Sequence, residues 1–431
     1  MNDILVIGGG FAGLWSAAGA ARMADILNKP LRITLVNPDD QHSIRVRNYE
    51  DDLRQTLVPL RSVLDPIGVA LTVGKVTGID TLRRSIRVQA QDGPQDLTYN
   101  KLVLASGSHV VRPALPHADD CLFDVDTYAQ AMRLGRHIAG LAGMPPCPGR
   151  FTAVVVGAGA TGVELACELP ARLRTVASAS SGKDAPEPIR VMLVDRGARI
   201  AGHLGGAQAV IERACRELGI ELLPGVAVAV LDAQGVTLSN GDRIDAATVV
   251  WCAGMRANEL TACVPAERDA QGRLLVDAFM RVQGVADVFA AGDVAHALID
   301  GEHASVMSCQ HARPMGRYAG HNAVCELHGL DMLALDIDWY TNIIDLGPAG
   351  AVYAQGWDRV VVAQGRQAKE TKQVINQQRI YPPRNGSRPD ILAAATPEVQ
   401  RPPVLNPGAM PPLPRMPPAT PPGPPLSHGR R

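Results

Sequence analysis

Two glycine runs in the sequence have the spacing of a phosphate-binding turn. Each run comes directly after a continuous apolar stretch and before a segment of helix-forming residues. The glycines are Gly8, Gly10 and Gly13 in the first run, and Gly157, Gly159 and Gly162 in the second. In this spacing the first glycine forms a tight turn, the second lets the backbone approach a pyrophosphate, and the third lets the helix pack closely on the strand. The N-terminus of the helix then stabilises the phosphate charge.

Each run therefore predicts a dinucleotide site at which the turn and the first helical residues contact the ligand. The expected contacts are Gly8, Gly10, Phe11, Ala12 and Gly13 at the first site, and Gly157, Gly159, Thr161 and Gly162 at the second. A glycine-rich turn without a ligand is the alternative. The order of strand, turn, helix and strand around both runs favours the dinucleotide.

The residue at the end of the following strand is expected to bind a ribose hydroxyl. After the first run this residue is Asn37, which can form a hydrogen bond but carries no charge, and Asp39 is the alternative. After the second run it is Asp195, whose carboxylate would bind the adenosine ribose and repel a 2′-phosphate. Asp195 therefore favours NADH over NADPH, although Arg196 and Arg199 could reverse this preference.

Two strand–turn–helix–strand units, about 150 residues apart, must position these residues. Their strands are apolar throughout, which is typical of parallel strands buried on both faces. The predicted fold class is therefore α/β, with two Rossmann-like dinucleotide-binding domains. Three further apolar strands end at small-residue turns that we expect to border the cofactors. These turns contain Ser106 and Gly107, then Gly254, then Gly292 and Asp293.

The ordered set of motifs resembles the flavoprotein oxidoreductases that have two dinucleotide-binding domains. Within that group, the runs GAGATGVELA at 157–166 and WCAGMRA at 251–257 resemble type II NADH dehydrogenases. The likeness covers about residues 1–330. It implies that the first unit binds FAD and that the second unit, inserted in the first, binds NAD(H), with NADP(H) less favoured.

The resemblance also implies roles for residues outside the glycine runs. Asp293 would contact the flavin ribitol, and the helix after it would point its N-terminus at the pyrophosphate; a helix N-cap is the alternative for Asp293. Ser106 and Gly107 would lie where the chain crosses between the domains. Glu164, on the first turn of the second helix, is either a partner of the helix dipole or a group beside the nicotinamide.

The resemblance is less complete in the residues expected near the electron acceptor. Type II dehydrogenases carry two glutamines on the helix beneath the flavin ring; here Gln310 is kept and Pro314 stands in place of the second. The family's C-terminal amphipathic membrane helices have no counterpart in this sequence. The residues that we expect to act in catalysis are Glu164, Gln310 and His311.

Other side chains are candidates for contacts near the flavin or the acceptor. They are His42, His321, Arg45 and Arg47. The alternative for each histidine is a hydrogen-bonded structural residue, and the alternative for each arginine is a surface position.

The resemblance and the composition together predict the domains. The FAD-binding domain is expected at 1–115 and 275–332, the NAD(P)H-binding domain at 116–274, a small α+β unit at 333–384, and a disordered proline-rich tail at 385–431. Proline fixes φ and lacks a backbone N–H, so the tail is not expected to form a helix or a central strand. The tail either binds a proline-recognising partner module or has no partner.

Charge and cysteine content exclude several classes of function. With 42 basic and 43 acidic residues the net charge is −1, which argues against a nucleic-acid partner. We identify no membrane-spanning stretch and no signal peptide, which predicts a cytoplasmic protein, with peripheral contact at the inner face of the membrane left open. The 8 cysteines form no C-x-x-C pair and no zinc-type spacing, so no metal site and no dithiol relay are expected.

The sequence as a whole predicts an FAD-dependent NAD(P)H oxidoreductase. NADH would pass a hydride to FAD, and the electrons would go on to a quinone-type acceptor, as in a non-proton-pumping NADH dehydrogenase. One alternative is a soluble reductase or oxidase that serves oxygen or a small electron-carrier protein. The other is a flavin- and NADH-binding interaction protein with little turnover.

Overall fold

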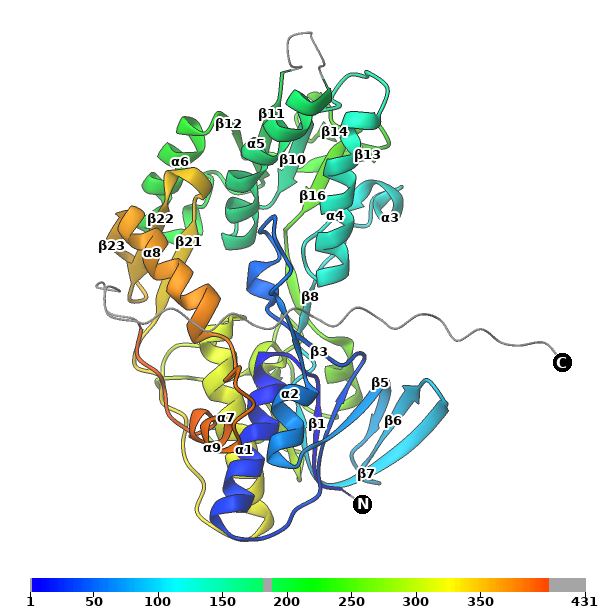
Figure 1. Cartoon of the computed structure of the whole chain (residues 1–431), viewed down its shortest axis with the longest axis vertical. Helices are drawn as coiled ribbons and strands as arrows, with labels where there is room; N and C mark the ends of the chain where they lie inside the picture. The colour runs from blue at the N-terminus through cyan, green and yellow to red at the C-terminus, as the bar shows by residue number, and fades with distance from the viewer. Residues whose placement is uncertain (1, 181–187, 403–431) are drawn as a thin grey trace, which may run out of the picture.

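The computed structural model describes residues 2–180 and 188–402. Figure 1 shows two α/β units, one above the other, with a smaller unit beside their junction. Each large unit is built on a sheet whose central strands are parallel and precede a glycine turn. The predicted fold class, α/β with two Rossmann-like domains, is confirmed.

The lower sheet is parallel around its central strand β1, which pairs with β2 and β7. Beyond these lie β5 on one side and β19 on the other. The bounds are β1 Asn2–Ile7, β2 Ile33–Asn37, β5 Ala70–Asp80, β7 Gly93–Leu104 and β19 Val288–Ala290. Antiparallel β6 (Ser85–Ala90) joins the far ends of β5 and β7. The side chains of Ile4, Leu5 and Val6 are fully buried, so β1 is covered on both faces, as its apolar sequence predicts.

Helices α1 (Phe11–Ile26) and α7 (Cys309–Leu327) lie side by side in the lower unit (Figure 1). A Cβ at Gly316 would lie 2.2 Å from the carbonyl oxygen of Ala12, and a Cβ at Gly320 would lie 1.9 Å from that of Ser16. Glycine at both positions lets the two backbones approach closely. This contact fixes the N-terminal end of α7 beside the first glycine turn.

The upper sheet has the strand order β12-β11-β10-β16-β9, and all of its pairings are parallel. The bounds are β9 Leu122–Phe123, β10 Thr152–Val156, β11 Arg190–Asp195, β12 Ile220–Pro224 and β16 Thr248–Trp251. The helices of this unit are α4 Tyr128–Gly140, α5 Ala160–Ser180 and α6 Ala207–Glu217. A small antiparallel sheet follows, with β13 Val228–Asp232, β14 Gly235–Leu238 and β15 Arg243–Asp245.

The chain crosses between the large units twice, and the two crossings pair with each other. They are the antiparallel strands β8 (Ser108–Val110) and β17 (Met255–Ala257). The short elements outside the main sheets are β3 Gln41–Ser43, β4 Leu57–Pro59, α2 Arg61–Leu64, α3 Ala118–Cys121, β18 Leu274–Leu275 and β20 Ala295–His296. The second unit is therefore inserted in the first, as the resemblance implied.

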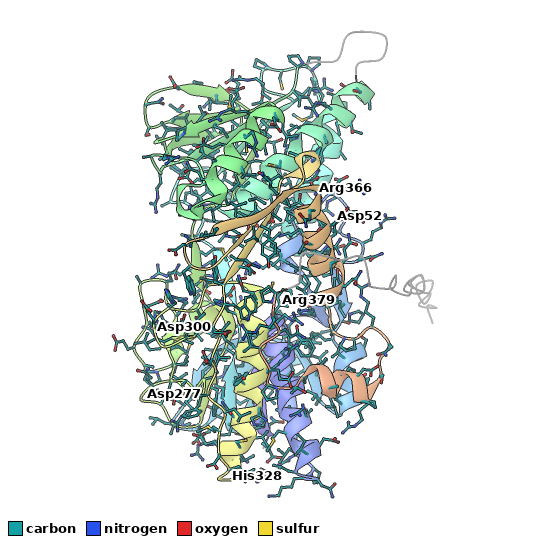
Figure 2. The ribbon with its side chains drawn as sticks, turned by 90° about the vertical axis from the view of Figure 1, so that its left-hand side faces the viewer. Asp52, Asp277, Asp300, His328, Arg366 and Arg379 are labelled. Atoms are coloured by element: carbon teal, nitrogen blue, oxygen red, sulfur yellow. The ribbon has the colours of Figure 1, made fainter. Side chains whose placement is uncertain are left out.

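The C-terminal unit is α+β, as predicted. An antiparallel sheet is formed by β21 Thr341–Asp345, β22 Ala351–Gln355 and β23 Val360–Gly365. Helix α8 (Arg366–Val374) continues into a π-helical turn, η8 (Ile375–Arg379). Figure 2 shows Arg379, at the end of this turn, at mid-height of the molecule, between the upper and lower units.

The predicted start of the disordered tail at residue 385 is wrong. Residues Arg388–Ala394 form helix α9, whose N-cap Ser387 accepts a hydrogen bond from the Asp390 N–H. Ile391 and Ala395 are fully buried against the core of the lower unit. Proline in the first turn of a helix loses no intrahelical hydrogen bond, so this local sequence is compatible with a helix although the region is proline-rich. Residues 403–431, to which the rest of the tail prediction applies, lie outside the described residues.

Candidate functional site

The first glycine turn links β1 to α1. Gly8 has a φ of +108°, and a Cβ there would lie 2.3 Å from the carbonyl oxygen of Ala105. A Cβ at Gly13 would lie 1.7 Å from the carbonyl oxygen of Gly8. A Cβ at Gly10, in contrast, would meet nothing within 4 Å. Open space at the second glycine is what a pyrophosphate against the turn requires.

The second glycine turn, between β10 and α5, repeats this geometry. Gly157 has a φ of +105°, and its Cβ would lie 2.9 Å from Ala253. A Cβ at Gly162 would lie 1.8 Å from the carbonyl oxygen of Gly157, whereas a Cβ at Gly159 would meet nothing within 4 Å. Both turns therefore have the shape of a dinucleotide site.

Asn37 and Asp195 stabilise the two turns in the same way. Asn37 Oδ1 accepts a hydrogen bond of 2.7 Å from the Gly9 N–H, and Asp195 Oδ2 accepts one of 2.7 Å from the Ala158 N–H. The Asn37 amide also donates to the backbone oxygen of Asp39 at 3.0 Å, so Asp39 supports Asn37. Each strand-end residue thus has a role in shaping its turn that the spacing did not reveal.

The arginines that follow Asp195 lie on the surface. Arg196 and Arg199 are both exposed, and neither forms an ion pair with another described residue. Asp195 is partly buried and accepts a second hydrogen bond from the Gly197 N–H at 2.7 Å. The carboxylate is therefore held in place by two backbone donors, whereas the arginines are not fixed to any carboxylate.

A cavity of about 430 Å³ opens at the carboxyl ends of β1 and β2. Its walls include Gly8, Asn37 and Ser106. Ser106 Oγ is buried and has no hydrogen-bond partner among the described residues. Buried hydroxyl groups normally have a partner, so an unsatisfied one beside an open glycine turn fits a bound dinucleotide. The residues present here fit the adenosine half of FAD.

Asp293 lies in a short turn, η6 (Gly292–Val294), on the same edge of the lower sheet. Its Oδ2 accepts a hydrogen bond of 2.6 Å from Ser108 Oγ, and burial raises the pKa of its carboxyl group. A Cβ at Gly292 would lie 2.7 Å from the Ala12 Cβ, which brings this turn against the start of α1. The next helix after Asp293 is α7, which begins at Cys309, and the strand β20 lies between them. Asp293 does not cap a helix.

Gly107 and Gly254 lie at the crossing between the units. The Asn258 N–H donates to the Gly107 oxygen at 2.9 Å, and the Val111 N–H donates to the Gly254 oxygen at 3.0 Å. Both glycines have positive φ, +73° and +77°. They therefore turn the chain into the paired crossing strands, next to the two crevices.

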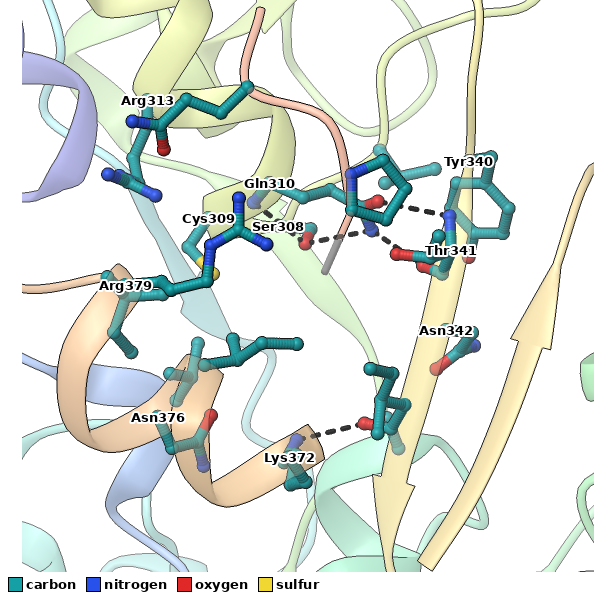
Figure 3. Close-up of a pocket in the computed structure, with 18 of the residues that line it drawn as sticks. Ser308, Cys309, Gln310, Arg313, Tyr340, Thr341, Asn342, Lys372, Asn376 and Arg379 are labelled. Carbon is teal, nitrogen blue, oxygen red and sulfur yellow. Dashed lines mark hydrogen bonds between the residues drawn. The ribbon is translucent and has the colours of Figure 1, made fainter. Parts of the chain in front are cut away.

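A second cavity, of about 380 Å³, lies where the three units meet (Figure 3). Helix α5 contributes Thr161 and Glu164, and α7 contributes Gln310. Strand β21 and the segment α8–η8 form the opposite wall, which includes Lys372. The N-terminal part of α5, where a nicotinamide is expected, and the N-terminal part of α7, where the acceptor is expected, thus open into one space.

Glu164 and Lys372 form a buried ion pair in the wall of this cavity. Lys372 Nζ donates to Glu164 Oε1 at 2.6 Å and to the Ile343 oxygen at 2.9 Å. Burial raises the pKa of Glu164. Burial by itself would lower the pKa of Lys372, but the facing carboxylate leaves that pKa above its usual value. Glu164 is therefore more than a partner of the helix dipole.

Asp345 extends this network. Its backbone N–H donates to Glu164 Oε1 at 3.1 Å, and its carboxylate accepts from Tyr49 Oη at 3.3 Å and contacts Lys369. Burial raises the pKa of Tyr49 well above its usual value. The sequence analysis missed Lys372, Asp345 and Tyr49, because only the tertiary structure brings these distant positions together. A helical spacing that puts Lys369 and Lys372 on one face was the sole available signal.

Gln310 lines the cavity, whereas His311 lies behind its wall. Gln310 Nε2 donates to the Thr341 oxygen at 3.0 Å, and Gln310 Oε1 accepts from the Thr341 N–H at 3.3 Å. His311 is fully buried, accepts a hydrogen bond from the Val306 N–H at 2.9 Å, and has its pKa lowered to about 4 by burial. The structure thus gives His311 a supporting position, and it is not among the residues that line the cavity.

His42 and His321 also have structural neighbours. His42 Nδ1–H donates to the Gly9 oxygen at 2.9 Å and contacts the Phe11 ring edge-on. Burial lowers the pKa of His42 to about 4. His321 contacts Cys325 one turn further along α7. His42 thus supports the first glycine turn from behind, and neither histidine lines the cavity at the junction.

Arg45 and Arg47 differ in their positions. Arg45 lines the cavity, donates to the Ser108 oxygen at 3.1 Å and pairs with Asp126. Arg47 is buried outside the cavity and donates to Glu50 Oε1 at 2.9 Å and to Tyr381 Oη at 2.7 Å. Arg45 is therefore the one of the two that could face a ligand.

Comparison with known proteins agrees with this geometry. Residues 2–316 match the model of the pyridine nucleotide-disulphide oxidoreductase family, and the chain belongs to that family of flavin-dependent oxidoreductases. The chain is 53% identical, over 404 residues, to a protein of Mycobacterium tuberculosis named NADH dehydrogenase-like; the match covers 93% of this chain and 99% of that protein. The predicted resemblance to NADH dehydrogenases is confirmed.

Two more distant similarities extend over nearly the whole chain. The chain is 24% identical to a type II NADH:quinone oxidoreductase of Staphylococcus saprophyticus, over 88% of this chain and 95% of that protein. The solved structure of NDH2 from Plasmodium falciparum superposes with a TM-score of 0.72 at 12% identity, covering 92% of this chain and 98% of that one. At this identity the structural match shows a shared fold.

Proposed function

We propose that the protein binds FAD at the first glycine turn and NADH at the second, and passes electrons to a quinone-type acceptor in the cavity at the junction. The FAD-binding domain would be 1–115 with 275–332, and the NAD(P)H-binding domain 116–274. The observations that carry this proposal are the pair of matching open turns and the one cavity that α5 and α7 both line, with the buried Glu164–Lys372 pair in its wall.

The chain would bind and orient both dinucleotides. FAD, when bound, would accept a hydride from NADH and pass two electrons to the acceptor. Gly10 leaves room for the pyrophosphate of FAD. Ser106 Oγ, which has no partner among the described residues, would form a hydrogen bond with FAD, and Asp293 lies on the same edge of the sheet. At the second turn the Asp195 carboxylate would bind the adenosine ribose of NADH and repel the phosphate of NADPH.

The cavity wall would provide protons to the acceptor. Two-electron reduction of a quinone takes up two protons, and a proton donor must lie within hydrogen-bond reach of the acceptor oxygen. Lys372 Nζ carries a proton in the wall, 2.6 Å from Glu164 Oε1, and would donate it to the acceptor. After each transfer the Glu164 carboxylate would take up a proton from water and pass it on to Lys372, so that two transfers supply the two protons. Gln310, fixed to Thr341 by two hydrogen bonds, would position the acceptor.

The visible spectrum before and after anaerobic NADH tests the core of this proposal. We expect flavin absorbance that NADH bleaches, and steady turnover with a short-chain quinone that exceeds turnover with oxygen. Turnover with oxygen or a carrier protein only would support a soluble reductase or oxidase instead. A colourless protein that cannot be reconstituted with FAD would rule out the proposal.

For localisation we propose a cytoplasmic protein with peripheral contact at the inner face of the membrane. Across residues 2–180 and 188–402, the helices include none that is long and apolar enough to cross a membrane. Contact with the membrane would bring a lipid-soluble quinone to the cavity. After cell lysis without detergent, we expect protein in the membrane fraction that high salt releases; its complete absence from that fraction would contradict this contact.

A further inference from the structure

Arg313 and Arg317 place two guanidinium groups at the α7 side of the junction cavity. The Arg317 guanidinium lies 4.6 Å above the Trp15 ring, and that of Arg313 lies 5.7 Å from the same ring. Arg317 is only 2% exposed. These arginines flank Pro314, where type II dehydrogenases have their second glutamine, so the acceptor end of this cavity carries two basic side chains.

Neither guanidinium is paired with a carboxylate of the described residues. No acidic side chain among the described residues lies within 4.0 Å of Arg313 or Arg317. Arg317 donates only to the backbone oxygen of Glu398, at 3.3 Å, and its Nε and Nη2 have no partner in the described part of the chain. Arg313 Nε is likewise buried without a partner.

Two other arginines with little exposure have a carboxylate partner. Arg47 and Arg273 are each 7% exposed and pair with Glu50 and Asp269. Buried charges are normally paired because transfer from water is costly. Burial lowers the pKa of Arg317 to about 9, which shows how poorly its charge is compensated. The unpaired guanidiniums of Arg313 and Arg317 therefore differ from those of Arg47 and Arg273.

Arg379 adds a third guanidinium from the opposite wall. Figure 3 shows its side chain extending from the α8–η8 segment towards α7, which carries Arg313 and Gln310. Arg379 donates to the backbone oxygen of Arg401 at 2.7 Å and pairs with no described carboxylate. Three basic groups from two elements thus converge on one end of the cavity, which is the arrangement that binds carboxylate, sulfonate or phosphate groups.

We propose that Arg313, Arg317 and Arg379 bind an acidic group carried by the electron acceptor. This inference rests on the proposed function and narrows the acceptor to anionic quinones or similar anionic carriers. The pyrophosphate of FAD is the competing occupant, because α7 begins beside the first glycine turn. That turn lines the other cavity, however, through Gly8, and none of the three arginines lines it. An anion here would satisfy the unpaired N–H groups and stack its ring system near Trp339 and Tyr340, which line the same cavity.

The test compares a naphthoquinone with the same ring bearing a sulfonate, as acceptors for the holoenzyme. In Arg317→Met we expect the KM for the sulfonated quinone to rise at least about tenfold, because one charge-assisted hydrogen bond is lost. The KM for the uncharged quinone and the bleaching of flavin by NADH should stay as in the wild type. Arg317→Lys, which keeps the positive charge, should have a KM for the sulfonated quinone close to that of the wild type.

Arg313→Met, at a less buried position, should also raise the KM for the sulfonated quinone. Arg384→Met removes a guanidinium that stacks on Tyr381 outside the cavity, and should change neither KM.

Calorimetry with a naphthalene sulfonate, which accepts no electrons, tests the site in the wild-type holoenzyme. We expect the naphthalene sulfonate to bind saturably to the wild type and more weakly to Arg317→Met. Uncharged naphthalene should not bind at this site. Equal KM changes for both quinones, or no sulfonate binding, would overturn the inference and leave the proposed function standing. Loss of flavin from Arg317→Met would show that the anion is the FAD pyrophosphate and would also overturn it. Failure of NADH to bleach the wild-type flavin would instead refute the proposed function.

Discussion

The two nucleotide units have the same turn but different surroundings. Both turns have an open second glycine and a strand-end side chain that accepts a hydrogen bond from the turn. In the lower unit the helix after the turn is buried along most of its length against α7. In the upper unit α5 presents Glu164 to the cavity and pairs with Lys372. The two turns thus share one backbone shape, and the units differ in what packs against the helix that follows the turn.

The largest expected effects come from filling the open glycine positions. Gly10→Val should yield protein without flavin absorbance, and Gly159→Val should keep the flavin but lose its bleaching by NADH. A Cβ at either position meets no protein atom within 4 Å, so the fold should tolerate both changes and the loss should fall on the ligand. Full flavin occupancy in Gly10→Val, measured by absorbance, would show that the assignment of the first site is wrong.

Glu164→Gln should separate reduction of the flavin from its reoxidation. We expect bleaching by NADH to persist and quinone turnover to fall about a hundredfold, which is typical of losing a proton-transfer group. The change also leaves Lys372 as an unpaired buried charge, which costs about 3–5 kcal/mol of stability. The double variant with Lys372→Met should recover the stability but not the turnover. Stopped-flow absorbance and urea unfolding measure the two effects, and an unchanged pH profile of turnover would contradict the role of the pair.

Acid should destabilise the lower unit through His42. The folded-state pKa of about 4 lies below the unfolded value of 6.5, so the neutral ring is favoured in the fold. This stability is complete above pH 6.5 and is lost as the pH falls towards 4, up to about 3 kcal/mol. His42→Asn, which can still donate to Gly9, should reduce the loss between pH 7 and pH 5 in urea unfolding. His117→Asn, at an exposed position, is the control for the removal of a histidine.

The smallest expected effects come from exchanging the strand-end residues. Asp195→Asn would keep the hydrogen bond to Ala158 and remove the repulsion of a 2′-phosphate. We expect its KM for NADH to rise up to about tenfold and its preference over NADPH to shrink, since a charge-assisted hydrogen bond is lost. Asn37→Asp in the first turn should change flavin content little. Steady-state kinetics of Asp195→Asn with NADH and NADPH measures the change in preference. An unchanged ratio of the KM for NADPH to the KM for NADH would contradict the role of Asp195.

Sequence patterns predicted the turns well and the histidines poorly. Glycine spacing reports local backbone requirements, which neighbouring residues fulfil by themselves. The position of a histidine side chain depends on packing, so His311, expected in catalysis, lies behind the cavity wall against Val306. The proline-rich composition concealed α9, because the burial of Ile391 and Ala395 against the core depends on the rest of the fold.

By itself, the sequence determined that there are two strand–turn–helix units, where their open glycines lie, and which family the chain belongs to. The two units depend on contacts between residues close together in the chain, from β1 to β2 and from β10 to β11. Only the tertiary structure decided that Lys372 faces Glu164 and that Arg313, Arg317 and Arg379 meet at one end of a cavity. These residues come from elements far apart in the chain. Their chemistry depends on the low exposure of Glu164, Lys372 and Arg317 and on the lack, among the described residues, of a carboxylate beside the three arginines. Neither property is present in the order of the amino acids until the chain has folded.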